Sequence, residues 1–139
     1  MTTLDTLDLF GVAMALGVRV EYADLEGRDG EYVHARRLIR LRAGMWPRLK
    51  RTVLAHECAH ALYGDVPTGD EAHDAAMERR ADRWAAAQLI NHVDYDDALA
   101  RHGGDTRAMG EDLGVVASLV EVFADTRRGD RVPLSARIR

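Results

Sequence analysis

The hydrophobic positions of the first forty residues change from helical spacing to alternation. Apolar side chains recur every three or four positions over residues 4–16 and predict an amphipathic helix. Short runs of alternating apolar and polar residues follow over residues 18–41, interrupted by the polar stretch 26–30. Alternation with β-branched and aromatic residues is typical of half-buried strands, and the polar stretch of a turn. We therefore expect three short strands that form a small antiparallel sheet.

Helical spacing returns after Pro47 and continues through the rest of the chain. A helix is predicted over residues 48–62, and its apolar second half indicates that it is buried on most sides. An alanine-rich helix is predicted over residues 71–90, and shorter helices over residues 95–128. Residues 131–139 are rich in arginine and poor in apolar side chains, so we expect a basic tail there.

Length and composition are those of a single globular domain. The chain has 139 residues, of which 47% are hydrophobic and 30% are charged, enough for one packed core. We expect an α+β fold formed by residues 1–130, with the small sheet packed on a mainly helical core.

Charge and cysteine content narrow the class of protein further. The net charge of −4 disfavours nucleic acid as the main partner, because phosphate binding favours a basic surface. The single cysteine, Cys58, excludes an internal disulfide and is compatible with a reducing compartment. No apolar run is long enough to span a bilayer and no signal-peptide pattern is present, so we expect a cytoplasmic protein without a membrane partner.

The candidate chemistry begins in the predicted helix 48–62, at His56-Glu57-Cys58-Ala59-His60. An H-E-x-x-H pattern places two imidazoles one turn apart on one helix face, where both can bind a single metal ion. Glu57 points about 100° around the helix from His56, so it is placed to act as a general base rather than as a ligand of the same ion. The alternative is a pair of core histidines bonded to nearby carbonyl groups. Cys58 is expected to face the core and to do no chemistry.

Two carboxylates in the next predicted helix complete the candidate site. Glu78 and Asp82 lie four residues apart on an apolar helix face, an unfavourable arrangement unless positive partners are present. We predict that Glu78 is the third metal ligand and that Asp82 accepts the second ring N–H of a ligand histidine. The alternative is a solvated face paired with Arg79, Arg80 and Arg83. Two histidines, one carboxylate and an open fourth position predict a catalytic site for one Zn²⁺ ion per chain.

The remaining polar aromatic residues offer weaker candidates. Hydrolysis of a peptide bond needs a donor for the developing oxyanion, and either Tyr63 or His73 is close enough in sequence to serve. The alternatives are a core aromatic residue for Tyr63 and a surface position for His73. No motif surrounds His34, His92 or His102, and we predict no functional role for them.

The motif and its surroundings resemble one family. Residues 51–62 (RTVLAHECAHAL) and 78–86 (ERRADRWAA) are similar to the H-E-x-x-H and E-x-x-x-D segments of the ImmA/IrrE metallopeptidases, a gluzincin-like pattern. The resemblance implies a zincin-like core in which His56, His60 and Glu78 bind zinc and Glu57 is the base. It also implies an intracellular endopeptidase of the kind often encoded by phages, which cleaves a helix-turn-helix transcriptional repressor. The edge of the sheet would then bind an extended substrate peptide.

Two other functions remain open from the sequence. Residues 106–123 resemble a helix-turn-helix, which would make the protein a DNA-binding one, but the stretch 116–123 has no arginine or lysine. Two short helices packed beneath the catalytic core explain these residues equally well. The protein could also be a non-catalytic, regulatory zinc-binding protein that binds a repressor or an anti-repressor.

Overall fold

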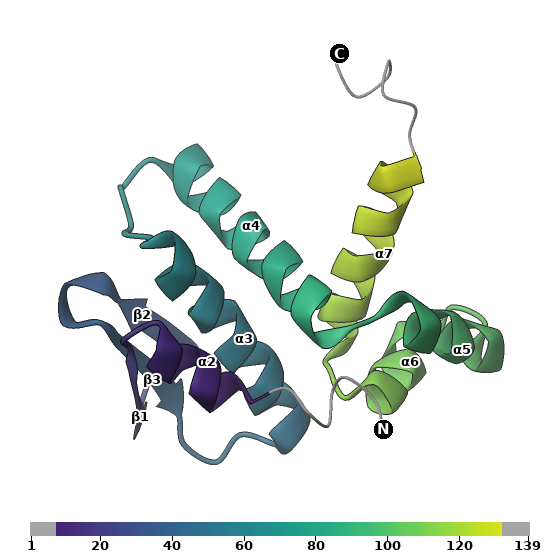
Figure 1. The fold of residues 1–139 in the computed structure, drawn as a ribbon, viewed down its shortest axis with the longest axis horizontal. Helices are drawn as coiled ribbons and strands as arrows, with labels where there is room; N and C mark the ends of the chain where they lie inside the picture. Colours follow the sequence, from purple (N-terminus) through teal and green to yellow (C-terminus); the bar gives the residue numbers. More distant parts are fainter. Residues whose placement is uncertain (1–7, 132–139) are drawn as a thin grey trace.

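The structure is a computed structural model, and it describes residues 8–131. Within this range the chain forms α2 (Leu9–Ala15), β1 (Arg19–Ala23), β2 (Gly30–Val33), the 3-10 turn η1 (His34–Arg36), β3 (Leu38–Arg42), α3 (Pro47–Tyr63), α4 (Glu71–Leu89), α5 (His92–His102), α6 (Thr106–Leu113) and α7 (Ala117–Arg131). Figure 1 shows the sheet beside α2 and α3 at one end of the molecule, and α5 and α6 at the other. The α+β class is confirmed.

The predicted helices agree closely with those observed. The helix expected over 48–62 is α3, and the one expected over 71–90 is α4. The helices expected over 95–128 begin earlier, because the side chain of Asn91 caps α5 by accepting a hydrogen bond from the backbone N–H of Asp94 at 2.7 Å. The start of the predicted helix 4–16 and most of the predicted tail 131–139 lie outside the described residues.

The sheet has three strands, but its pairing differs from the prediction. The strand order is β1-β3-β2, in which β3 pairs antiparallel with β2 and parallel with β1. An all-antiparallel sheet is therefore wrong for the pair β1–β3. The physical reason is burial, since β3 holds the most apolar residues, and Leu38, Ile39 and Leu41 are fully buried in the centre of the sheet. Strand β2 forms one edge of the sheet.

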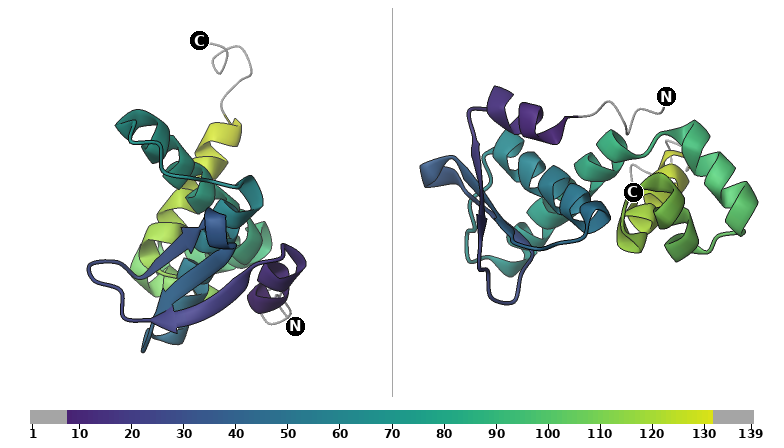
Figure 2. Two further views of the ribbon diagram at one scale, coloured as in Figure 1. Left: turned by 90° about the vertical axis from the view of Figure 1, so that its left-hand side faces the viewer. Right: turned by 90° about the horizontal axis from the view of Figure 1, so that it is seen from below.

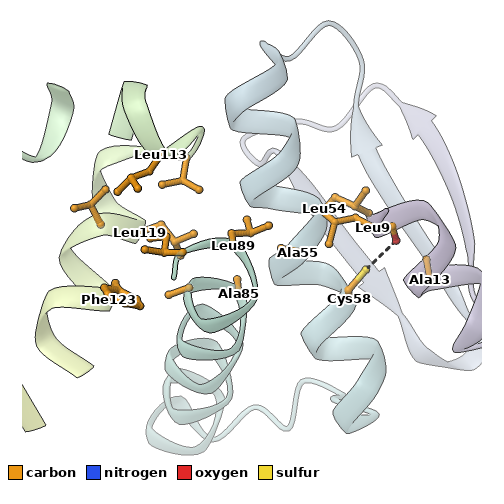
Figure 3. Close-up of a cluster of buried hydrophobic side chains, with 14 of the residues drawn as sticks. Leu9, Ala13, Leu54, Ala55, Cys58, Ala85, Leu89, Leu113, Leu119 and Phe123 are labelled. Atoms are coloured by element: carbon orange, nitrogen blue, oxygen red, sulfur yellow. Dashed lines mark hydrogen bonds between the residues drawn. The ribbon is translucent and has the colours of Figure 1, made fainter. Parts of the chain in front are cut away.

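Helix α3 lies at the centre of the molecule, between the sheet and α4. Figure 2 shows α3 and α4 between the sheet on one side and the C-terminal helices on the other. One hydrophobic core extends from α2 through α3 and α4 to α7, where Leu119 and Phe123 pack near Leu89 (Figure 3). Burial of eight α3 residues, His60 and Glu57 among them, confirms that this helix is enclosed on most sides.

Cys58 belongs to this core rather than to the candidate site. Its side chain is fully buried, and its Sγ lies 3.9 Å from the carbonyl oxygen of Leu9 in α2 (Figure 3). Burial, together with the charge of Glu57, raises the pKa of the thiol to about 12. The expectation that Cys58 faces the core is confirmed.

Residues 106–123 form α6 and the first half of α7. Leu113, Leu119, Val120 and Phe123 are buried, so these helices contribute to the core. Among the described residues, no helix is both long enough and apolar enough to cross a lipid bilayer.

Candidate metal centre

Helix α3 ends close to the start of helix α4, and this brings polar residues of the two helices together. Gly64 ends α3 in the left-handed conformation, with φ of 64°, and turns the chain toward Asp65. Asp70 caps α4 by accepting hydrogen bonds from the backbone N–H groups of Ala72 and His73. Helix α4 then returns along α3, so that Glu78 faces the two histidines of the motif.

His56, His60 and Glu78 meet at one point. The Nε2 atoms of His56 and His60 lie 3.0 Å apart, and a Glu78 carboxylate oxygen lies 2.8 Å from Nε2 of His56. The same oxygen lies 3.4 Å from Nε2 of His60. Among the described residues, these three are the group of histidine, cysteine and acidic side chains close enough together to hold a metal ion.

Each histidine is oriented by a carboxylate on its other ring nitrogen. Nδ1 of His56 lies 2.7 Å from Asp82, and Nδ1 of His60 lies 2.8 Å from Asp65. An Nδ1–H bonded to a carboxylate leaves the Nε2 lone pair free to bind a metal, an arrangement common to metal-binding histidines. The prediction for Asp82 agrees with this geometry.

Asp65 is the site residue that sequence reasoning missed. Its side chain is 7% exposed, and its other oxygen pairs with Nη2 of Arg80 at 2.6 Å. The available signal was an acidic residue five positions after His60, directly beyond the end of the helix. The guanidinium of Arg80 pairs with Asp65 and stacks on Tyr63, 4.0 Å from the ring centre. The alternative of a salt-bridged surface required Arg80 to neutralise Glu78, and it does not.

The donor set fits a metal ion. Three ligand atoms at 2.0–2.1 Å from a tetrahedral zinc ion lie about 3.3 Å from one another, close to the separations of 2.8, 3.0 and 3.4 Å between the Nε2 and carboxylate atoms. Two Nε2 lone pairs that face each other at 3.0 Å repel unless a cation lies between them. A metal ion or a proton can supply that charge.

The electrostatics of the centre favour such a cation. Burial lowers the pKa of His56, but the hydrogen bond to Asp82 and the charges of Glu57, Asp82 and Glu78 outweigh it and raise this pKa to about 9. Glu78 and Asp82 themselves are more exposed than an apolar helix face would suggest, with side chains 60% and 45% exposed. The centre therefore opens to solvent on the α4 side.

Glu57 lies on the sheet side of the centre. It is 6% exposed, and burial raises the pKa of its carboxyl group, an effect that the nearby His56 and His60 partly offset. Gly30, the first residue of β2, is in close contact with it: a Cβ atom at Gly30 would lie 3.3 Å from Oε2 of Glu57 and 2.6 Å from a Val53 methyl group. Glycine thus lets the edge strand approach the motif helix closely.

The centre lies in a cavity of about 1010 Å³. Its walls are formed by β2 and η1, by the polar face of α3, by α4 and by the start of α7; they include Gly30, Tyr32, His34, Glu57, Asp65, Glu78, Asp82 and Ser118.

The two predicted oxyanion donors lie elsewhere. Tyr63 is 42% exposed, and its ring lies against Arg80. His73 lines a neighbouring hollow with Ala76 and Arg83. The structure therefore brings neither residue to the wall of the cavity that holds the three candidate ligands.

Comparisons with known proteins match most of the chain. The sequence model of the Peptidase_M78 family, described as an IrrE N-terminal-like domain, matches residues 13–124. The chain is 31% identical over 104 residues to the radiation response metalloprotease IrrE of Deinococcus deserti. That similarity covers 68% of this chain but 37% of the Deinococcus protein, so the chain spans well under half of that relative's length.

Proposed function

The chain belongs to the Peptidase_M78 family of IrrE-like metallopeptidases, and from this premise we propose that it is a zinc-dependent endopeptidase. One observation carries the proposal. The Nε2 atoms of His56 and His60 and the carboxylate of Glu78 converge on one point, with Glu57 buried beside them. Structural zinc sites are closed and rich in thiolates, whereas this set has two histidines, one carboxylate and an exposed side.

The protein groups divide the work of hydrolysis. Zinc, when bound by His56, His60 and Glu78, supplies a Lewis acid that polarises the peptide carbonyl and makes water more acidic. Glu57 takes a proton from the attacking water as the new C–O bond forms, and gives that proton to the amine nitrogen as the C–N bond breaks. Among residues 8–131 the Glu57 carboxylate has no hydrogen-bond partner, so it is free to receive the proton, and its burial stabilises the protonated form in between.

The substrate peptide is proposed to bind along β2. This strand is an edge of the sheet, and Gly30, Glu31, Tyr32 and Val33 all line the cavity. An edge strand offers unpaired backbone N–H and C=O groups to an extended peptide, which adds to the sheet as a further strand. The close contact between Gly30 and Glu57 then supports a reacting bond near the start of β2.

We propose a helix-turn-helix transcriptional repressor, or a similar regulator, as the substrate. This part rests on the family resemblance of residues 51–62 and 78–86. More acidic than basic side chains line the cavity, which is compatible with a basic, DNA-binding substrate. Nucleic acid itself is not the main partner in this proposal, because α7 uses its apolar residues in the core and exposes Glu121.

The test is cleavage of a defined peptide mixture. The zinc-loaded protein is incubated with a proteome-derived peptide library and with purified repressors encoded beside its gene, and the products are identified by mass spectrometry. We expect cleavage that stops with a chelator and in Glu57→Gln, whose zinc content stays normal. Cleavage that survives in Glu57→Gln would contradict the mechanism. A zinc-loaded wild type that cuts nothing would favour the non-catalytic partner-binding alternative.

A further inference from the structure

His34, for which the sequence indicates no role, lies on the wall of the catalytic cavity. It is the first residue of η1 and follows directly after the edge strand β2. Its half-buried ring lies over the end of α3, because a Cβ atom at Gly64 would be 3.3 Å from Cε1 of His34. The ring of His34 therefore lies beside α3 about one turn beyond His60, and it lines the same cavity.

Hydrogen bonds from Tyr32 and Arg37 favour one tautomer of His34. Nδ1 of His34 lies 2.7 Å from the hydroxyl oxygen of Tyr32, and Nη1 of Arg37 donates to that oxygen at 3.4 Å. Donation from Arg37 polarises the hydroxyl and favours donation of its own hydrogen to Nδ1 of His34. The ring hydrogen of a neutral His34 then lies on Nε2.

Arg37, which donates to the Tyr32 hydroxyl, has an unusual backbone conformation. Arg37 has φ of 47°, and it is the described residue other than glycine with a positive φ. Its guanidinium also donates to the carbonyl oxygen of Leu16. Left-handed backbone at a non-glycine residue is unfavourable and persists where the surroundings hold it. The fold thus maintains Arg37 in reach of Tyr32.

Nε2 of His34 has no hydrogen-bond partner among residues 8–131. No described side chain around the cavity accepts a hydrogen bond from this nitrogen. A half-buried donor without an acceptor is unfavourable unless water or a ligand satisfies it. A peptide bound along β2 would offer main-chain carbonyl oxygens as such acceptors.

Distances along the fold show where that carbonyl lies. From Glu57 to Gly64, seven residues of α3 rise about 10 Å. From Gly30 beside Glu57 to His34, the edge strand extends about 13 Å. A peptide that lies along β2 with its reacting bond at Glu57 therefore reaches His34 about three to four residues from that bond.

We propose that His34, held as the Nε2–H tautomer by Tyr32, donates a hydrogen bond to a main-chain carbonyl of the substrate peptide and so sets the minimum substrate length. The inference rests on the proposed peptidase function. It assigns His34 to binding the substrate away from the reacting atoms, and Tyr32 to positioning His34. His34 is not part of the group that can hold the metal, so its loss leaves zinc binding intact.

The test compares His34→Ala and Tyr32→Phe with wild type on a peptide that the wild type cleaves. Loss of one hydrogen bond predicts a KM about 3- to 10-fold higher in His34→Ala, with kcat nearly unchanged. When the peptide is shortened stepwise from each end, trimming from one end should raise the KM of wild type to that of His34→Ala and abolish the difference. His102→Ala is the matched control, since His102 pairs with Asp112 away from the cavity.

A spectroscopic measurement reports on the tautomer without any substrate. Long-range ¹H–¹⁵N spectra of the zinc-loaded protein should show His34 as the Nε2–H tautomer, with a mixture of tautomers in Tyr32→Phe. An unchanged KM in His34→Ala, a lower kcat with the same KM, or an equal defect on full-length and trimmed peptides would overturn the proposal. A wild type that cleaves no peptide overturns the proposed function and this inference with it, whereas a normal wild type with an insensitive His34→Ala overturns the inference alone.

Discussion

Replacement of Asp65 by asparagine should weaken metal binding although Asp65 is not a ligand. Its buried carboxylate accepts from Nδ1 of His60 at 2.8 Å and from Arg80 at 2.6 Å. The amide of the Asp65→Asn variant would have one acceptor oxygen for two donors and no charge. A hydrogen bond to a charged group contributes about 1.5–3 kcal/mol and a neutral one about 0.5–1.5 kcal/mol, so replacing two charged bonds by one neutral bond costs about 2.5–4.5 kcal/mol of folding stability.

The effect on the metal comes through His60 alone. Loss of an outer-shell partner lowers metal affinity about 10- to 100-fold, which corresponds to about 1.4–2.8 kcal/mol. Zinc affinity is measured by competition with a chromophoric chelator, and folding by circular dichroism. Asp112→Asn is the matched control, because Asp112 also accepts from a histidine and an arginine, at 2.8 and 3.4 Å, but far from the cavity. A folded Asp65→Asn protein with wild-type zinc affinity would refute the reasoning.

Three further predictions follow from the glycine contact, the core thiol and the site charges. Gly30→Ala should lower the free energy of unfolding by about 1–3 kcal/mol in urea titrations, because the new methyl group would lie 2.6 Å from Val53; Gly129→Ala, which has open space, should not destabilise the protein. Native Cys58, buried and with its pKa raised to about 12, should react with Ellman's reagent only on unfolding; rapid labelling of the folded protein would contradict its placement. In metal-free protein the pKa of His56 is raised from 6.5 to about 9, so its contribution to stability is complete below pH 6.5 and is lost as the pH rises through 9. Tm measured in chelator should fall over that interval, and zinc should bind more tightly as the pH rises; a flat Tm would show that His56 is not protonated there.

The site was predictable from sequence where it depends on helical spacing. His56 and His60 lie one turn apart in any α-helix, and so do Glu78 and Asp82, so each pair could be placed on a face without a structure. The sequence did not predict that these two helix faces meet. They meet because α4 runs back antiparallel along α3. The fold class and the burial of Cys58 followed from the same periodicity.

Long-range contacts account for what the sequence did not reveal. The order β1-β3-β2 depends on which strand is buried on both sides, a property of the whole core rather than of local alternation. Asp65 and His34 lie in connecting segments, where no periodicity predicts a direction for a side chain. Gly30 carries no chemistry, and its importance is visible only beside Val53 and Glu57.

The central claim is that His56, His60 and Glu78 hold one metal ion, and metal content tests it most directly. Zinc is measured by inductively coupled plasma mass spectrometry after the folded protein is loaded with zinc and passed through gel filtration. We expect about one zinc per chain in wild type and in His102→Ala, and none in His56→Ala. A folded wild type without bound zinc, or a His56→Ala protein that keeps it, would contradict the account.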